Sequence, residues 1–100
     1  MNKYKQNLKA LAHLSSDEIR RTIRKGDDDF IIAILDSVWT TLDGRVELST
    51  RQLRSIRSVQ PVLRRFASRG QSVDERRHQL LNRTGINAIR TVFKILQTRF

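Results

Sequence analysis

Residues 27–44 read DDDFIIAILDSVWTTLDG, and this stretch decides the fold. Three aspartates open it, and negative charge is favoured at the start of a helix because that end carries a partial positive charge. The apolar side chains that follow occupy nearly every side of a helix until Gly44 ends the pattern. Their β-branched members also permit a strand, but the run is longer than a typical strand. A helix that is apolar almost all round is normally buried, so we predict a central helix over about 28–43.

Three serines outside this stretch mark the starts of further helices. Ser15, Ser49 and Ser72 are each followed three residues later by Glu or Gln. In such a capping box, each of the two side chains accepts a hydrogen bond from the backbone amide of the other residue. Two more helices are predicted, one over about 3–13 and one after Gly85, where apolar residues recur every three to four positions.

The predicted helix over 50–69 contains Pro61 near its middle. Proline has no backbone N–H and its ring clashes with the preceding turn, so we expect a kink or a break near this residue. The connections between all the predicted helices are short, which favours antiparallel neighbours. The sequence therefore predicts an all-α fold, a compact bundle of five to six short helices in a single domain over 1–100.

Large apolar side chains supply the candidate core. On the helix over 50–69 they recur on one side, at Leu53, Ile56, Val59, Leu63, Phe66 and Ala67. Four aromatic residues are also expected in the core, namely Phe30, Trp39, Phe66 and Phe93. Tyr4 and Phe100 are then the aromatic residues expected to be exposed.

The basic residues are concentrated in the later half of the chain. The formal net charge is +10, from 20 basic and 10 acidic residues. Residues 1–50 contain eight of each sign and are neutral, whereas residues 51–100 contain twelve basic residues and only two acidic ones. Arginine supplies 15 of the 20 basic residues. A guanidinium group can grip phosphate oxygens through two parallel hydrogen bonds, so this excess favours a polyanionic partner.

Arginines cover the side of the predicted helix over 50–69 that lies opposite its apolar residues. They are Arg51, Arg54, Arg57, Arg64, Arg65 and Arg69, with no carboxylate among them. Solvated helix faces usually mix the two signs, because like charges three or four residues apart cost stability. Arg76, Arg77 and Arg83 extend the predicted basic surface, and the backbone amides at Ser49 and Ser72 are candidate phosphate sites.

These features predict a non-enzymatic protein that binds nucleic acid, DNA in preference to RNA, without strong sequence preference. If about six arginines each displace a counterion from duplex DNA, the logarithmic salt dependence of binding has a slope near −5. A helix-turn-helix over 72–97 is disfavoured, because its last helix offers only Arg90 and Lys94 as cations. Binding of single strands by stacking needs exposed aromatic residues, and most are expected in the core. An acidic protein surface would satisfy the same arginines.

A structural adaptor is the alternative function. Such a protein would use the apolar helices over 28–43 and after Gly85 to form a homo-oligomer, or to dock on a capsid or another partner protein. Burial in an oligomer would also relieve the repulsion that a net charge of +10 creates in a small chain.

Residues suited to catalysis or metal binding are sparse. The chain has no cysteine, which excludes disulfides, thiolate catalysis and cysteine-ligated zinc. His13 and His78 are far apart, and the charge preference of a helix start explains the aspartates at 27–29. We therefore expect no enzyme, no cofactor and no metal site. The longest apolar run, 30–35, is too short to span a bilayer, and no secretory signal is present, so we expect an intracellular protein without a membrane partner.

A set of short motifs lies between about 28 and 96. They are LDG at 42–44, VELS at 46–49, LRRFA at 63–67, Ser72 followed by the arginine pair at 76–77, and LL at 80–81 before Gly85. In these motifs the chain resembles small basic helical proteins encoded near capsid genes in adintovirus-like and Maverick-type elements of animals. It departs from their pattern at Thr40, at TGIN over 84–87 and at Pro61. The resemblance implies a viral or mobile-element origin, a location in the nucleus or virion, and a packaging or virion-core role, with no active site.

Overall fold

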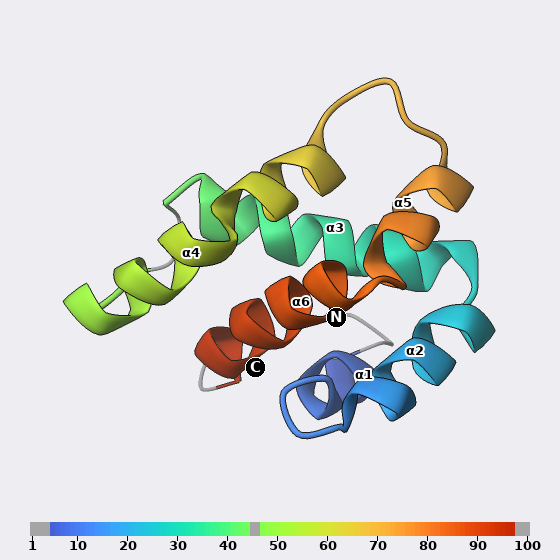
Figure 1. Cartoon of the computed structure of the whole chain (residues 1–100), viewed down its shortest axis with the longest axis horizontal. Helices are drawn as coiled ribbons and strands as arrows, with labels where there is room; N and C mark the ends of the chain where they lie inside the picture. Colours follow the sequence, from blue (N-terminus) through green and yellow to red (C-terminus); the bar gives the residue numbers. More distant parts are fainter. Residues whose placement is uncertain (1–4, 45–46, 98–100) are drawn as a thin grey trace.

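Six α-helices make up the described part of the protein. The structure, a computed structural model, describes residues 5–44 and 47–97, and these contain no strand. The helices are α1 (Lys5–Ala10), α2 (Ser16–Lys25), α3 (Asp28–Leu42), α4 (Thr50–Ala67), α5 (Val73–Leu80) and α6 (Arg83–Leu96). They form one bundle with a radius of gyration of 12.3 Å (Figure 1). None of these described helices is long and apolar enough to cross a membrane. The predicted all-α bundle of short helices is confirmed.

The starts of α2, α3, α4 and α5 agree with the sequence-based prediction. Ser15, Ser49 and Ser72 precede α2, α4 and α5, and each forms the predicted capping box. At the start of α2, hydrogen bonding to the side chain and the backbone amide of Ser15 lowers the pKa of Glu18. Asp27 caps α3 through its carboxylate. These starts are predictable because a cap involves only residues within one helical turn.

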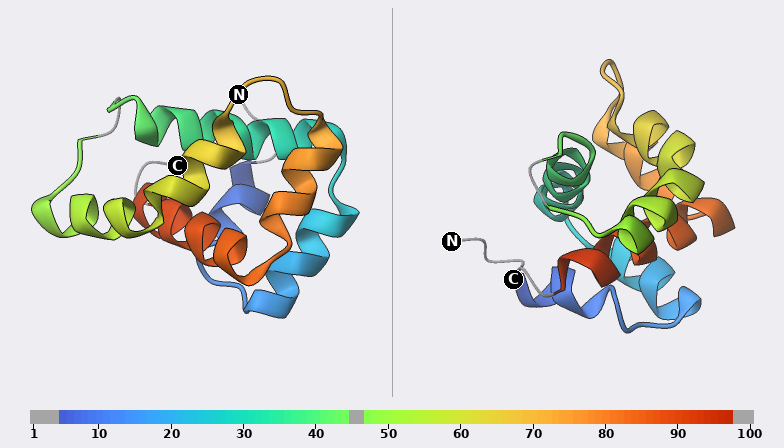
Figure 2. Two further views of the ribbon diagram at one scale, coloured as in Figure 1. Left: turned by 45° about the horizontal axis from the view of Figure 1, so that its top comes forward. Right: turned by 90° about the vertical axis from the view of Figure 1, so that its left-hand side faces the viewer.

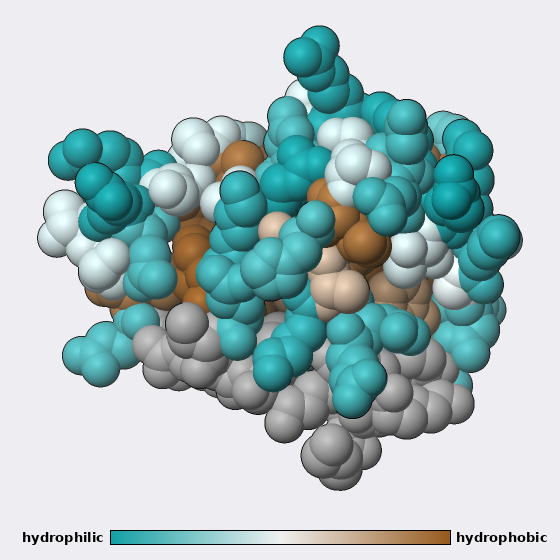
Figure 3. Space-filling view, turned by 90° about the horizontal axis from the view of Figure 1, so that it is seen from below, coloured by the Kyte–Doolittle hydropathy of each residue, from teal (hydrophilic) through white to brown (hydrophobic). Residues whose placement is uncertain are grey.

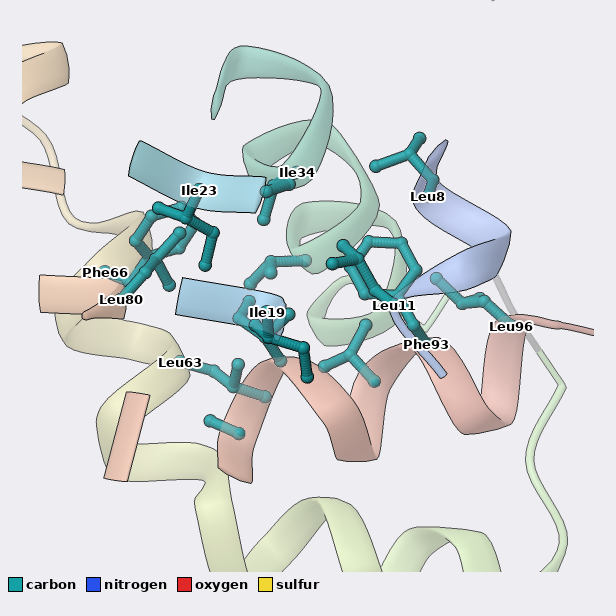
Figure 4. Packing of buried hydrophobic residues seen from close by; sticks show 14 of the residues in the cluster. Leu8, Leu11, Ile19, Ile23, Ile34, Leu63, Phe66, Leu80, Phe93 and Leu96 are labelled. Atoms are coloured by element: carbon teal, nitrogen blue, oxygen red, sulfur yellow. The ribbon is translucent and has the colours of Figure 1, made fainter. Parts of the chain in front are cut away.

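α6 lies at the centre of the bundle and contacts each of the other five helices. Its inner residues Ile86, Ile89, Val92 and Phe93 are buried. Side chains from α1, α2, α3, α4 and α5 converge on this helix (Figure 4). The core is therefore shared between the two halves of the chain, and neither half contains a complete core of its own.

α3 packs against one side of the bundle and does not occupy its centre, which differs from the sequence-based expectation. Its inner face is buried, but Ile32 and Trp39 each keep 41% of their surface exposed. The predicted core position of Trp39 is therefore wrong, whereas Phe30, Phe66 and Phe93 are buried as predicted. A helix that is apolar on two sides needs neighbours on both, and here the neighbours of α3 all lie on its inner side.

α4 runs without a break through Pro61. Its axis changes direction near the proline, which is clearest in the left view of Figure 2. Because proline has no N–H, the carbonyl of Arg57 loses its usual donor within the helix. Of the two outcomes predicted from the sequence, a kink or a break, the structure shows a kink. The first turns of α4 extend beyond the rest of the bundle, and Leu53 on its predicted apolar side is 43% exposed there (Figure 1).

Gly85 lies within the first turn of α6 and not in the connection before it, where the sequence placed it. It is buried, and its amide donates a hydrogen bond of 2.7 Å to the side chain of Asn82, the N-cap. A Cβ atom at this position would collide with the carbonyl oxygen of Gln79 and would lie 2.9 Å from the Cα of Leu80. Glycine is therefore required here by the close approach of α6 to the end of α5.

Candidate nucleic-acid interface

The α4 arginine face is the largest group of unneutralised cations that the sequence predicted. It consists of Arg51, Arg54, Arg57, Arg64 and Arg65 on α4, together with Arg69 just beyond its end. All six side chains are exposed. At 100° per residue the five arginines on α4 lie within an arc of roughly 140°, opposite the buried Ile56 and Leu63. At the left of Figure 3, the end of the molecule at which the first turns of α4 protrude, hydrophilic residues (teal) lie among residues of intermediate and apolar character.

No carboxylate pairs with this face within the described residues. The ion pairs of the described chain lie elsewhere, between Arg20 and Asp17 and between Arg77 and Asp28, each at 3.1 Å. Arg64 has a neutral neighbour, because the side-chain oxygen of Gln60, in the amide orientation that satisfies both groups, accepts from its Nε at 3.2 Å and its Nη2 at 2.9 Å. The α4 arginine face therefore presents its charge to solvent.

This arrangement costs the isolated helix some stability. Arg51 and Arg54, and Arg54 and Arg57, are like-charged pairs three residues apart within α4. Each such pair destabilises a helix by about 0.2–0.5 kcal/mol, a cost that an anion lying across the face would remove. Binding of a ligand with several negative charges would therefore relieve the repulsion between these arginines.

Arg76 and Arg77, also predicted as binding residues, are engaged inside the fold. The Nη1 of Arg76 donates to the carbonyl of Phe66 at the end of α4. The Nη1 of Arg77 donates to the carbonyls of Ile23 and Gly26 at the end of α2, both at 2.6 Å, and its Nη2 meets Asp28. Only 17% of the Arg77 side chain is exposed. These two arginines connect α5 to the ends of neighbouring helices and do not join the α4 arginine face.

The remaining predicted positions are only partly available to a ligand. Arg83 is exposed in the first turn of α6, and no described hydrogen bond or ion pair links it to the arginines of α4. At Ser49 and Ser72 the capping boxes already use the amides of the serine and of the residue three positions on. The predicted amides of Ser49 and Ser72 themselves are therefore already occupied.

Two further arginines have structural roles that the sequence did not predict. The Nε of Arg20 donates to the carbonyl of Leu81 at 3.1 Å, and the Nη2 of Arg90 donates to the hydroxyl of Ser16 at 3.0 Å. Arg90, counted as a free cation in the helix-turn-helix alternative, is half-buried. No local pattern distinguishes these arginines, because their acceptors lie more than 60 residues away in the sequence.

A crevice between α3 and α4 adjoins the α4 arginine face. Its volume is about 360 Å³, and its lining includes Trp39 and Asp43 from the α3 end and Arg64 from α4. A second crevice of about 240 Å³ lies next along α4 and is lined by Arg57 and Gln60 among others. The sequence did not identify the first crevice because it placed Trp39 in the core. Tyr4 and Phe100, the aromatic residues predicted to be exposed, lie outside the described residues.

No family model, curated protein or solved structure matches this chain. The candidate interface is therefore defined by the geometry of the chain itself, and above all by the α4 arginine face.

Proposed function

We propose that the protein binds nucleic acid through the α4 arginine face, which grips the phosphate backbone. The observation that carries this proposal is the set of six exposed guanidinium groups with no carboxylate partner among the described residues. Each guanidinium can give two parallel hydrogen bonds to phosphate oxygens. Arg76 and Arg77 are left out of the proposed interface, because both are half-buried and already donate hydrogen bonds within the fold.

The dimensions of the face suit a polymer of phosphates. Between Arg51 and Arg65 an α-helix rises roughly 21 Å, at 1.5 Å per residue. Duplex DNA advances 3.4 Å per base pair, so this length corresponds to about six base-pair steps. Backbone contacts of this kind position a protein on nucleic acid but carry no sequence information. We therefore propose binding without sequence preference, which is compatible with the packaging or virion-core role that the resemblance predicts.

The test compares the salt dependence of binding in two variants. In the first, Arg54, Arg57 and Arg65 are changed together to glutamine. Each lost phosphate contact removes about 0.9 from the logarithmic salt slope on duplex DNA, so loss of three of six contacts is expected to halve the slope, from about −5 to about −2.5. The measurement is a titration of labelled duplex at several salt concentrations between 50 and 200 mM, the range over which phosphate contacts are most informative.

The matched control is the triple change of Arg21, Arg24 and Lys25 to glutamine on α2. These side chains are also exposed, and their loss lowers the net charge by the same amount. The control is expected to keep the slope near −5. Equal losses in both variants would show a general effect of net charge and would contradict a defined interface on α4.

The structural adaptor remains a second candidate, and one observation favours it. Ile32 and Trp39 on α3 are each 41% exposed, and aromatic side chains such as that of Trp39 are enriched in protein interfaces. α6 is not available for such a contact, because its apolar side chains are taken up by the core. Light scattering distinguishes the two, since an adaptor would form an oligomer that persists at high salt without nucleic acid.

A further inference from the structure

Trp39 lies where the exposed side of α3 meets the α4 arginine face. Trp39 is 41% exposed and lines the same 360 Å³ crevice as Arg64. No hydrogen bond or ion pair involves this side chain within the described part of the chain. Arg57 lines the adjoining crevice and lies two turns of α4 before Arg64. A partly exposed tryptophan and two exposed arginines thus line two neighbouring crevices.

The charges around Trp39 define how a ligand can approach it. Asp36 is exposed on α3 one turn before Trp39, and Asp43 lines the crevice on its other side. These carboxylates repel phosphate, whereas the arginines across the crevice attract it. A strand would therefore run along α4, with its phosphates on Arg57 and Arg64 and with a base turned toward the indole.

A base is a better occupant than an apolar protein surface. Ile32, the other exposed apolar side chain of α3, is two helical turns from Trp39, roughly 10 Å along the axis. Asp29 and Asp36, both exposed, lie on the same side of α3 as Ile32. The apolar residues are thus interrupted by carboxylates, and a large continuous patch of the kind that marks protein interfaces is not formed.

We propose that Trp39 is a stacking platform for one unpaired base of a single-stranded nucleic acid, whose neighbouring phosphates are held by Arg57 and Arg64. This inference rests on the proposed function and adds a preference for single strands at this position. Stacking of bases on aromatic side chains tolerates any sequence, because every base has a π-face. A paired base in a duplex is stacked on its neighbours and is not available to the indole.

The chain itself supplies the probe, because Trp39 is its only tryptophan. Indole fluorescence is followed while the wild-type protein is titrated at low salt with a twelve-nucleotide oligo(dT), and separately with a duplex of the same length. Stacking is expected to quench the fluorescence on the single strand and to leave it nearly unchanged on the duplex. Absence of quenching at saturating oligo(dT), with binding verified by anisotropy of a labelled strand, would overturn the proposal.

A pair of matched variants tests the same point through affinity. Trp39→Phe keeps a flat aromatic ring, and Trp39→Leu keeps apolar volume without one. Trp39→Leu is expected to weaken oligo(dT) binding roughly five- to hundredfold and to change duplex binding less than twofold, whereas Trp39→Phe keeps most of the affinity. Circular dichroism of both variants verifies the fold. Equal affinities of the two variants for oligo(dT) would contradict stacking.

Two further outcomes separate the possible failures. Ile32→Ala should leave oligo(dT) binding unchanged. Concentration-dependent quenching without nucleic acid that Ile32→Ala abolishes would instead identify a second copy of the chain as the occupant, and would overturn the proposal. If the triple change of Arg54, Arg57 and Arg65 weakens duplex binding while Trp39→Leu has no effect, the stacking site alone is wrong. If that triple change alters the binding of neither the duplex nor oligo(dT), the proposed function fails as well.

Discussion

At the scale of the residue, arginine has two different uses in this protein. Arg20, Arg76 and Arg77 donate to backbone carbonyls at or near the ends of helices, while the arginines of the α4 arginine face point to solvent. The last carbonyls of a helix have no partner within it, and a guanidinium offers five N–H donors in a fixed fork. The same side chain that suits phosphate therefore also suits a helix end.

Arg77 provides a test of the structural use. Arg77→Gln removes charged hydrogen bonds to Ile23 and Gly26 and the pair with Asp28, and each such bond contributes about 1.5–3 kcal/mol. We expect the free energy of unfolding, measured by urea denaturation, to fall by at least about 1.5 kcal/mol. Arg77→Lys should restore little of it, because an ammonium group cannot reproduce the forked geometry.

Arg65→Gln is the control for this prediction. Arg65 is exposed and makes no side-chain bond within the described residues, so the unfolding free energy should change by less than about 0.5 kcal/mol. The affinity of the Arg65→Gln variant for duplex DNA should fall. The Arg77→Gln variant should bind duplex DNA as the wild type does under conditions in which the variant is folded. A stable Arg77→Gln protein with weakened DNA binding would show that the two uses have been assigned the wrong way round.

At the scale of the element, local signals decide the helix starts and long-range contacts decide the packing. Each capping box closes within one turn, so Ser15, Ser49 and Ser72 could be read as starts without knowledge of the fold. The role of Gly85 could not be predicted in this way. A glycine is required at this position because the backbone of α5 lies against it, and only the tertiary structure brings α5 against α6.

Gly85→Ala tests this close approach. The added Cβ would overlap the carbonyl of Gln79, so α5 or α6 must shift. Overpacking of this kind costs about 1–3 kcal/mol, and we expect a loss of that size in the free energy of unfolding. Asn87→Ala on the exposed side of α6 is the control, expected to be neutral or slightly stabilising. If Gly85→Ala is instead more stable, as an exposed glycine in a helix would be, the close approach does not exist.

At the scale of the whole molecule, the two halves of the chain depend on each other. α6 packs against α1, α2 and α3 as well as α4 and α5. Arg20, Arg77 and Arg90 also bond across the boundary between the neutral and the basic half. The single domain predicted over 1–100 is consistent with this packing and can be tested directly.

We expect one cooperative unfolding transition. Thermal unfolding followed by far-ultraviolet circular dichroism and by Trp39 fluorescence should give the same midpoint, because small single domains unfold in an all-or-none manner. A fragment of residues 48–100 should remain unfolded, since α6 would lose its contacts with α1, α2 and α3. Two separate transitions, or a cooperatively folded fragment, would mean that the basic half is a domain of its own.

The fold class, the starts of α2, α3, α4 and α5, a distortion of α4 at Pro61 and the concentration of charge on α4 could all be predicted from the sequence alone. They depend on residues within one or two turns of each other, or on composition, and neither needs knowledge of the packing. Only the tertiary structure decided that Arg76 and Arg77 serve the fold, that Trp39 is exposed beside Arg64, and that Gly85 lies inside a helix. The physical reason is that each of these depends on which helix lies opposite, and residues distant in the sequence settle that by packing together into the core.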